Sequence, residues 1–322
     1  MLPSGNKYLE VRKLIYTVTF NPAIDYVVRA GSITLGEVNR SSGEQIFFGG
    51  KGINVSAVLS ELGFKSKALG FTAGFTGEAI EKGVQAMGID ADFVRLEKGS
   101  SRINVKIKAQ EETELNGQGP DIDKKALDEL FDKLDKLEDG DILILAGSIP
   151  SSLPPNIYEM ILKRLKGKRI KTVVDATKEL LLSVLKYEPF LIKPNDKELG
   201  EMFGVTLETD EQTALYAARL KEMGAVNVLV SMAGRGAMLI DENGKTHRCG
   251  VCKGEVKNSV GAGDSMVAGF IAGVLLQQEW DDANPADYSF ALKLGTAAGG
   301  ATAFSDGLAK KALIDKLLKT LD

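Results

Sequence analysis

The sequence predicts an α/β protein: a parallel sheet covered by helices, with a small antiparallel sheet at one end. Apolar strand-like runs alternate along most of the chain with amphipathic helical runs, the pattern of a parallel sheet with crossover helices. Two stretches interrupt it because their polar and apolar residues alternate and no long helix separates them. The 322 residues, 44% of them hydrophobic, suffice to bury a full core.

The two alternating stretches are residues 16–48 and residues 102–114, the second reading RINVKIKAQEETE. An antiparallel sheet with one face on the protein and one in water has this pattern. We expect them to form a lid over one end of the main domain.

The remaining elements follow in alternating order. Apolar runs predict strands at 141–147, 171–176, 189–195 and 226–234. Amphipathic spacing predicts helices at 155–166, 178–185, 196–203 and 211–223.

Composition excludes several classes of function. A net charge of -4 and a pI near 5.4 argue against a basic nucleic-acid surface. The apolar runs are shorter than the roughly 20 residues of a membrane helix, and the N-terminal MLPSGNKYLEVRK lacks a signal-peptide core. We expect a cytoplasmic protein with small-molecule partners, neither nucleic acid nor membrane.

A CxxC pair, Cys249 and Cys252, follows His247. A tetrahedral zinc site normally needs four protein ligands, and the chain has no third cysteine and no second histidine. We therefore interpret the pair as reduced thiols. The single histidine, in a predicted turn, also argues against a Ser-His-Asp triad.

The sequence NSVGAGDSMVAGF, residues 258–270, predicts a catalytic helix start. An apolar helix follows the glycines, so the backbone amides of Gly261, Ala262 and Gly263 lie where they lack intrahelical partners. Such amides, with the helix dipole, favour a phosphate. Asp264 beside them is placed to accept a proton from an attacking hydroxyl, although an isolated acid here is more often a helix cap.

A second glycine cluster, FFGGKGINVSAVLSELG, opens a helix that ends at Gly63. A tight loop into a helix would explain the glycines alone. Lys51 and Asn54 at the same helix start favour a polyol or phosphate site, because ammonium and amide groups bind several oxygens of one ligand.

Six motifs together resemble the ribokinase-like, or PfkB, sugar kinases. They are NPAID (21–25), GGKGIN (49–54), GSIP (147–150), KPNDKE (193–198), SMAGRGA (231–237) and NSVGAGDSMVAGF. The resemblance runs from about Ile15 to the C-terminus, and the two glycine-rich signatures occur in the family's order, about 200 residues apart.

The resemblance implies a three-layer αβα domain over residues 15–322, a β lid, and an N-terminal tail of residues 1–14. It implies ATP and Mg²⁺ as cofactors, with Asp264 as the base and the three preceding amides as an anion hole. The sugar would contact Asp25, Gly50, Lys51 and Asn54. Asn195 and Glu198 match the family's NxxE motif, which places Mg²⁺ largely through water. The nucleotide would contact Lys193, Ser231, Gly234, Gly236, Ala298, Gly299 and Ser305.

The motif wording is most similar to family members that act on ketohexose phosphates. The resemblance implies phosphorylation of fructose 1-phosphate to fructose 1,6-bisphosphate, with tagatose 6-phosphate or fructose 6-phosphate as alternative substrates. Arg40 and Arg102 match arginines that contact the substrate phosphate, and a guanidinium suits a dianion. The chain departs from much of the family at Asn258, where an Asp is common; this leaves the base in place but puts ion arrangements near the anion hole in question.

Two other classes of protein fit the sequence less well than a kinase does. A dinucleotide-dependent oxidoreductase would need G-x-G-x-x-G after the first strand, where this chain has NPAID. A sugar-phosphate sensor without catalysis would be expected to lack Asp264 or the NxxE pair. The exposed edges of the lid favour a homodimer through it.

Overall fold

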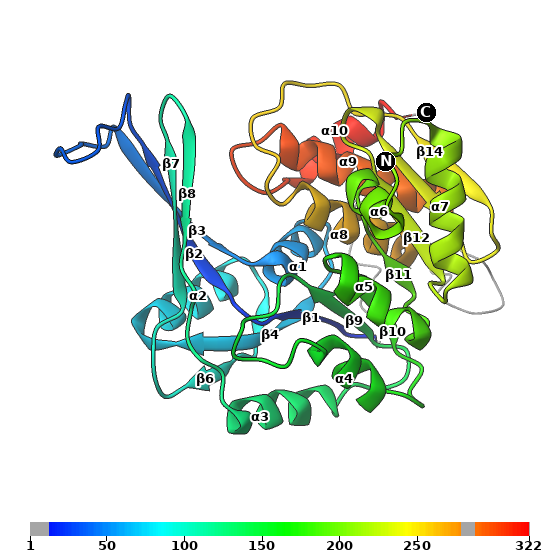
Figure 1. Cartoon of the computed structure of the whole chain (residues 1–322), viewed down its shortest axis with the longest axis horizontal. Helices are drawn as coiled ribbons and strands as arrows, with labels where there is room; N and C mark the ends of the chain where they lie inside the picture. Colours follow the sequence, from blue (N-terminus) through cyan, green and yellow to red (C-terminus); the bar gives the residue numbers. More distant parts are fainter. Residues whose placement is uncertain (1–12, 278–286, 322) are drawn as a thin grey trace.

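The computed structural model describes residues 13–277 and 287–321 and shows an α/β body from which a small sheet projects at one end (Figure 1). Most of the predicted N-terminal tail, residues 1–12, lies outside the described residues. In the described residues, no helix is long and apolar enough to cross a membrane.

The body contains a ten-stranded sheet with the order β14-β13-β12-β11-β10-β9-β1-β4-β5, and β6 also pairs with β4. Its strands are β1 (Ile15–Thr19), β4 (Ser66–Ala73), β5 (Asp90–Ala91), β6 (Val94–Leu96), β9 (Ile142–Ala146), β10 (Lys171–Asp175), β11 (Leu191–Ile192), β12 (Asn227–Ser231), β13 (Ala237–Ile240) and β14 (Thr246–Cys249). The strands from β12 to β5 pair in parallel, and β13 and β14 are antiparallel. The carboxyl ends of the parallel strands therefore meet at one edge.

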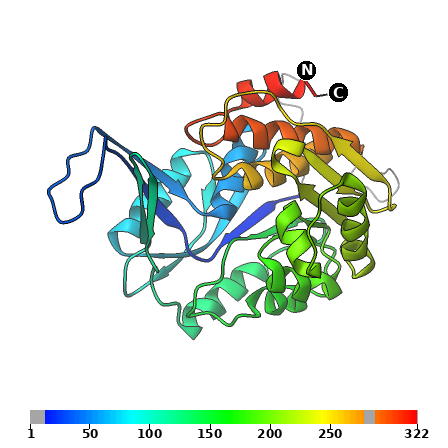
Figure 2. The ribbon, with the colours of Figure 1, turned by 45° about the horizontal axis from the view of Figure 1, so that its top comes forward.

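Helices cover both faces of this sheet (Figure 2). One apolar core lies under α3 (Lys124–Leu134), α4 (Ile157–Arg164), α5 (Lys178–Val184), α6 (Asp196–Phe203) and α7 (Asp210–Glu222). The other face packs against α1 (Lys51–Glu61), α2 (Gly74–Ala86), α8 (Ala262–Leu276), α9 (Tyr288–Ala303) and α10 (Lys311–Leu318). Two short 3₁₀ turns, η1 (Leu185–Tyr187) and η2 (Ala233–Arg235), complete the described elements. The result is the predicted αβα arrangement.

The most buried helix is α8, which lies against both α1 and α9. Small residues allow this contact: a Cβ added to Gly273 would lie 2.6 Å from the Cα of Ala291 on α9. Because its sides are covered by protein, α8 holds its first turn, which carries Asp264, in a fixed position.

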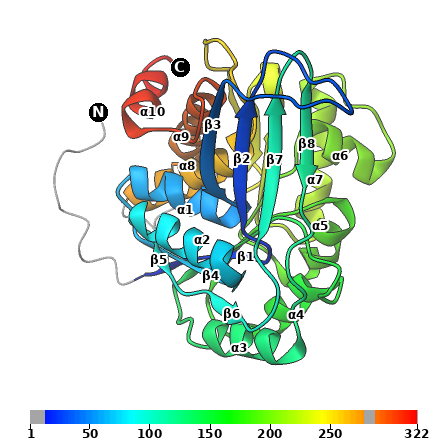
Figure 3. The same cartoon turned by 90° about the vertical axis from the view of Figure 1, so that its left-hand side faces the viewer.

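The small sheet, called the lid below, has the order β3-β2-β7-β8 (Figure 3). It consists of β2 (Ala23–Arg29), β3 (Gly43–Gly49), β7 (Arg102–Lys108) and β8 (Glu112–Asn116). The two outer pairs are antiparallel, whereas β2 and β7 in the centre are parallel. Alternation places the polar side chains of Asp25, Arg102 and Asn104 on one face of the lid.

The predicted lid boundary at residue 16 was wrong, because β1 lies in the middle of the large sheet between β4 and β9. Two buried threonines produced the polar-apolar alternation there. The hydroxyl of Thr17 hydrogen bonds that of Ser56 at 2.8 Å, and the Thr19 hydroxyl accepts from the Ile53 amide at 3.1 Å. Polar side chains with internal partners can thus occupy a fully buried strand.

A second correction concerns His247, which lies in strand β14 and not in a turn. Its ring hydrogen bonds the carboxylate of Asp241 at 2.8 Å. The imidazole is therefore part of the β13–β14 edge of the sheet.

Candidate active site

A cavity of about 480 Å³ lies where the carboxyl ends of the parallel strands face the polar face of the lid. Its walls bring together residues far apart in the sequence. They are Ala23, Asp25, Gly50, Lys51, Asn54, Arg102, Asn104, Lys106, Glu114, Asn116, Asp175, Lys193, Asn195, Glu198, Ser231, Val260, Gly261, Gly263 and Asp264. Most of the predicted substrate, metal and catalytic residues therefore share one cavity.

Asp264 lies in the first turn of α8, after Gly261, which adopts the left-handed conformation (φ 80°). The residue is 5% exposed, and its carboxylate accepts a 2.8 Å hydrogen bond from the Asn54 amide on α1. Burial, with repulsion from Asp175, raises the pKa of Asp264 to about 6, against the opposing effects of Asn54 and two lysines. A carboxyl group with such a pKa is ionised near neutral pH yet basic enough to take a proton.

Asp175, at the end of β10, lies between two cations. The ammonium groups of Lys51 and Lys193 each approach its Oδ1 at 3.5 Å. Burial disfavours the charge on Lys51, but Asp175, Asp264 and Glu198 outweigh this and raise its pKa. The Oδ2 atom of Asp175 is buried and has no hydrogen-bond partner within the described residues. A cation or a water molecule in the cavity would satisfy it.

Glycines around the cavity allow neighbouring side chains to approach the backbone closely. A Cβ on Gly263 would lie 3.1 Å from the ammonium nitrogen of Lys193, and one on Gly50 (φ 129°) would lie 2.4 Å from the Cγ2 of Thr19. Gly261 and Gly263 line the cavity, whereas the amide of Ala262 donates to the Ser259 carbonyl at 3.2 Å. Two of the three predicted anion-hole residues thus face the cavity.

On the lid, the carboxylate of Asp25 is held from the neighbouring strand β7. The Asn104 amide donates to its Oδ1 at 2.8 Å, and the Lys106 ammonium lies 3.3 Å from its Oδ2. Arg102 donates through Nε to the Asn21 carbonyl at 3.1 Å, and burial lowers its pKa. The lid therefore places two cations, Arg102 and Lys106, and two carboxylates, Asp25 and Glu114, around the cavity.

Asn195 and Glu198 form a reciprocal capping box at the start of α6. The Asn195 side chain accepts from the Glu198 amide and the Glu198 carboxylate accepts from the Asn195 amide, both at 2.8 Å. Asn195 also bridges to Ser231 at the end of β12. No group of three or more His, Cys, Asp or Glu side chains in the described ranges could hold a metal ion by itself.

Several predicted residues lie elsewhere. Arg40 is on the exposed loop between β2 and β3, outside the cavity wall, because the lid strand ends at Arg29. Ala298 has no exposed surface and packs against α8, and a Cβ on Gly299 would lie 3.1 Å from the Ala262 carbonyl oxygen. These two residues pack helices together in this structure.

Ser305 lines a second cavity, of about 580 Å³, which shares Asp25 and Asn54 with the first. Gly234 and Gly236 belong to the turn after β12, beside β14. Asn258, at the departure from the family pattern, also lines the second cavity, and its side chain accepts from the Val260 amide at 3.0 Å.

Sequence reasoning missed Asp175, Asn104 and Lys106. Asp175 is the second-last residue of the strand predicted at 171–176, and a carboxylate near the carboxyl end of a parallel strand was the available signal. Asn104 and Lys106 alternate with apolar residues in RINVKI, which puts them on the same face as Arg102.

The cysteines take no part in this site. Both are free and buried, and burial raises the pKa of Cys252 to about 11 and that of Cys249 above its usual value. A thiol held protonated in this way is a poor nucleophile and metal ligand.

Known proteins resemble this chain in sequence and in fold. The pfkB family carbohydrate kinase model matches residues 18–313. The chain is 45% identical to 1-phosphofructokinase of Bacillus subtilis (strain 168) over 305 residues, covering 95% of this chain and 97% of the relative. It is 35% identical to D-tagatose-1-phosphate kinase of Bacillus licheniformis, covering 94% and 97%. The solved structure of phosphofructokinase-2 from Escherichia coli in complex with substrates and products has the same fold, with a TM-score of 0.87, 24% identity and coverage of 95% and 99%.

The chain belongs to the pfkB family of carbohydrate kinases. It is a sugar kinase, an enzyme that transfers a phosphoryl group to an alcohol.

Proposed function

We propose that this kinase transfers the γ-phosphoryl group of ATP to the C6 hydroxyl of fructose 1-phosphate and forms fructose 1,6-bisphosphate. The observation that carries the proposal is that the buried carboxylate of Asp264 and the guanidinium of Arg102, on the lid, line the same cavity. A substrate with a phosphate at one end and a hydroxyl at the other fits these two groups. The 1-phosphofructokinase named above supports the choice of sugar.

Asp264 acts as the general base in this proposal. Its ionised carboxylate accepts the proton of the sugar hydroxyl as the oxygen attacks the γ-phosphorus. The amide of Asn54 orients the carboxylate through its 2.8 Å bond, so that the other oxygen is directed to the substrate. Gly261 and Gly263 line the cavity at the N-terminus of α8, where the helix dipole favours the charge on the transferred phosphoryl oxygens.

The phosphorylated sugar is bound by Arg102, which contacts its phosphate group, and by Asp25, which contacts its hydroxyl groups. The bond from Arg102 to the Asn21 carbonyl engages Nε, and the terminal amines can donate to phosphate oxygens. Asp25, fixed by Asn104 and Lys106, accepts hydrogen bonds from sugar hydroxyls. Gly50, Lys51 and Asn54 complete the sugar contacts. Arg40 lies outside this cavity in the single chain, so Arg102 carries the phosphate contact here.

The nucleotide phosphates lie toward Lys193 and Ser231 in this account, with the Gly234 and Gly236 turn along the nucleotide. Lys193 is 5% exposed and lines the cavity beside Gly263, so its charge can offset that of a phosphate. The nucleotide contacts expected for Ala298 and Gly299 have no support from their packed positions, whereas Ser305 faces the neighbouring cavity.

The residues present fit a hydrated Mg²⁺. Glu198, Asn195 and Asp175 line the same cavity, and the Oδ2 atom of Asp175 has no hydrogen-bond partner among the residues that the structure describes. Oxygen ligands reached partly through water are the usual setting of this ion. When bound, Mg²⁺ would neutralise and orient the ATP phosphates.

The apolar outer face of the lid supports a homodimer. Ile46, Ile103 and Leu115 are exposed on that face, from three of the four strands, and exposed apolar side chains gathered on one face favour an interface. Leu115→Glu should convert a dimer to monomers in light scattering; a monomeric wild type would contradict the dimer. As an ATP-dependent sugar kinase the protein would act in the cytoplasm.

The substrate is tested by ATP consumption with fructose 1-phosphate, tagatose 6-phosphate, fructose 6-phosphate and fructose at equal concentrations. The proposal predicts the highest kcat/KM for fructose 1-phosphate. A higher kcat/KM for tagatose 6-phosphate or fructose 6-phosphate would make that sugar the substrate in place of fructose 1-phosphate. If no ATP were consumed with any of the four sugars, the proposed activity would be refuted.

A further inference from the structure

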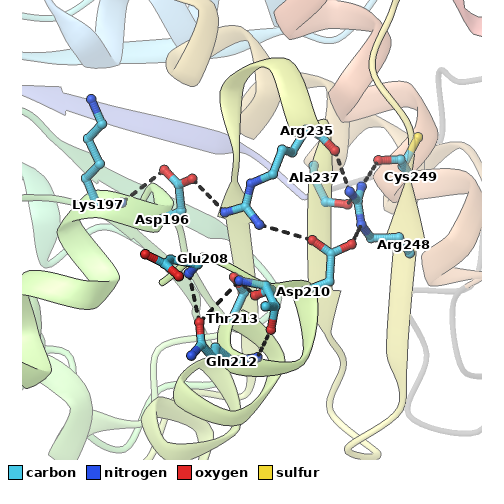
Figure 4. A network of polar contacts seen from close by, with 11 residues as sticks. Asp196, Lys197, Glu208, Asp210, Gln212, Thr213, Arg235, Ala237, Arg248 and Cys249 are labelled. Carbon is cyan, nitrogen blue, oxygen red and sulfur yellow. Dashed lines mark hydrogen bonds and ion pairs between the residues drawn. The ribbon is translucent and has the colours of Figure 1, made fainter. Parts of the chain in front are cut away.

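A network of two arginines and two aspartates lies behind the turn that follows β12 (Figure 4). Arg235, in this turn, donates to the Asp196 carboxylate at 2.9 Å and to the Asp210 carboxylate at 3.2 Å. Arg248, on β14, donates to the other oxygen of Asp210 at 2.7 Å. Asp196 and Asp210 are the first residues of α6 and α7, where the helix dipole also stabilises a negative charge. Arg235 therefore joins the turn to the starts of two helices.

The backbone of the same turn is held from its other side. Arg248 donates to the carbonyl of Arg235, to that of Ala237 at 3.3 Å and to that of Cys249. Both the side chain and the carbonyl group of Arg235 thus have charged partners, and the charges of the two arginines match those of the two aspartates. A network balanced in this way fixes geometry.

The conformation of the turn explains why such support is needed. Ala233 adopts a left-handed backbone conformation (φ 45°), which costs a residue with a side chain on the order of 1 kcal/mol or more. Gly236, also left-handed (φ 89°), approaches β14 so closely that an added Cβ would lie 2.3 Å from the Cys249 carbonyl oxygen. A backbone of this kind persists only where its surroundings hold it.

The network also controls the first turn of α6. Asp196 follows Asn195 directly and lies two residues before Glu198, so its bond to Arg235 fixes the rotation of the turn that carries both. The residues just before α6 are joined to the end of β12 by a 3.2 Å hydrogen bond from the Ser231 amide to the Pro194 carbonyl and by the bridge between Ser231 and Asn195. Arg235 itself is outside the cavity wall.

We propose that Arg235 is a positioning residue for MgATP, which aligns the turn at 231–237 with the Asn195–Glu198 corner of α6 through its two carboxylate partners. This inference rests on the proposed function, since it takes that corner and Ser231 as the metal and nucleotide side of the cavity. Arg235 contacts neither reactant. Its effect reaches the cavity through Ser231 and Asn195.

The test is the binding of MgATP to the full chain by calorimetry, without sugar. Arg235→Ala should raise the Kd by about tenfold or more, the usual size of an effect transmitted through residues that orient a metal site. Arg235→Lys keeps the positive charge, so it should give a smaller increase in Kd than Arg235→Ala. It should not restore the wild-type Kd, because a single ammonium cannot reproduce the forked contacts to two carboxylates. In steady-state assays, Arg235→Ala should raise KM for ATP and the Mg²⁺ requirement, while KM for fructose 1-phosphate changes less than about twofold.

The matched control is Arg169→Ala. Arg169 also pairs with an aspartate, Asp139, at 3.0 Å, but at the amino end of β10, away from the cavity. This variant should bind MgATP like the wild type. Combining Arg235→Ala with Asp196→Asn should cost less than the sum of the two single changes, because both remove the same contact.

An unchanged Kd for MgATP in Arg235→Ala would overturn the inference. Equal weakening of the binding of ATP and of fructose 1-phosphate, together with a lower melting temperature, would also overturn it, because that result would indicate destabilisation of the whole fold. Because the binding measurement contains no sugar, a wrong choice of sugar leaves its result valid. A wild type that binds no MgATP would refute the proposed function together with this inference.

Discussion

The amide of Asn54, on α1, donates a 2.8 Å hydrogen bond to the buried carboxylate of Asp264 on α8. The two residues are 210 positions apart in the sequence and belong to its two glycine-rich motifs. The bond joins the proposed sugar side of the cavity to the proposed base, and it stabilises the ionised form of a carboxyl group whose pKa burial raises.

Asp264→Asn should lower kcat by about 10² to 10⁴, because the amide keeps the shape of the side chain but cannot accept the proton. KM for the sugar phosphate should change little. The measurement is steady-state ATP consumption, and wild-type turnover in this variant would exclude Asp264 as the base.

The pKa of about 6 for Asp264 predicts the acid side of the pH profile. The base must be ionised, so kcat/KM for the sugar should be level above about pH 7 and fall about tenfold per pH unit well below pH 6. Asn54→Ala removes a bond that lowers this pKa, so its acid limb should lie at higher pH. A limb at the same pH in both proteins would mean that another group controls it.

Glu198→Gln should raise the Mg²⁺ requirement and lower kcat, because it removes a charge from the corner proposed to hold the hydrated metal. The control is Glu201→Gln on the same helix, an exposed residue paired with Lys178 and outside the cavity wall. A Mg²⁺ titration of Glu198→Gln that coincides with that of Glu201→Gln would leave Glu198 as a helix cap only.

Arg102→Ala should raise KM for fructose 1-phosphate tenfold or more, about 1.4 kcal/mol, and leave KM for ATP nearly unchanged. Arg102→Lys should recover part of the loss, because an ammonium keeps the charge without the forked geometry. Equal increases in both KM values would contradict a direct contact with the sugar phosphate.

The elements that could be predicted from the sequence are those with local signals. Helix α6 begins after a capping residue, Asn195, and is followed by Gly204 in a left-handed conformation, and its predicted ends match the structure. The start of the lid could not be located in this way, because Thr17 and Thr19 have internal partners that only the tertiary structure supplies.

The same distinction holds at the site. Asp264, Lys51 and Asn54 lie at glycine-rich helix starts, which a sequence reveals. Asp175 comes from a strand whose lateral position depends on the strand order of the whole sheet, and no local pattern sets it beside Lys51 and Lys193. The Arg235 contacts join three elements, and no local sequence pattern predicts them either.

Phosphorus NMR of the product formed from fructose 1-phosphate and MgATP is the decisive measurement of phosphoryl transfer to C6. We expect fructose 1,6-bisphosphate as the product, formed with a kcat/KM at least about 100-fold above that for fructose, because only the phosphorylated sugar engages Arg102. Equal kcat/KM for fructose and fructose 1-phosphate, or the absence of the bisphosphate, would contradict it.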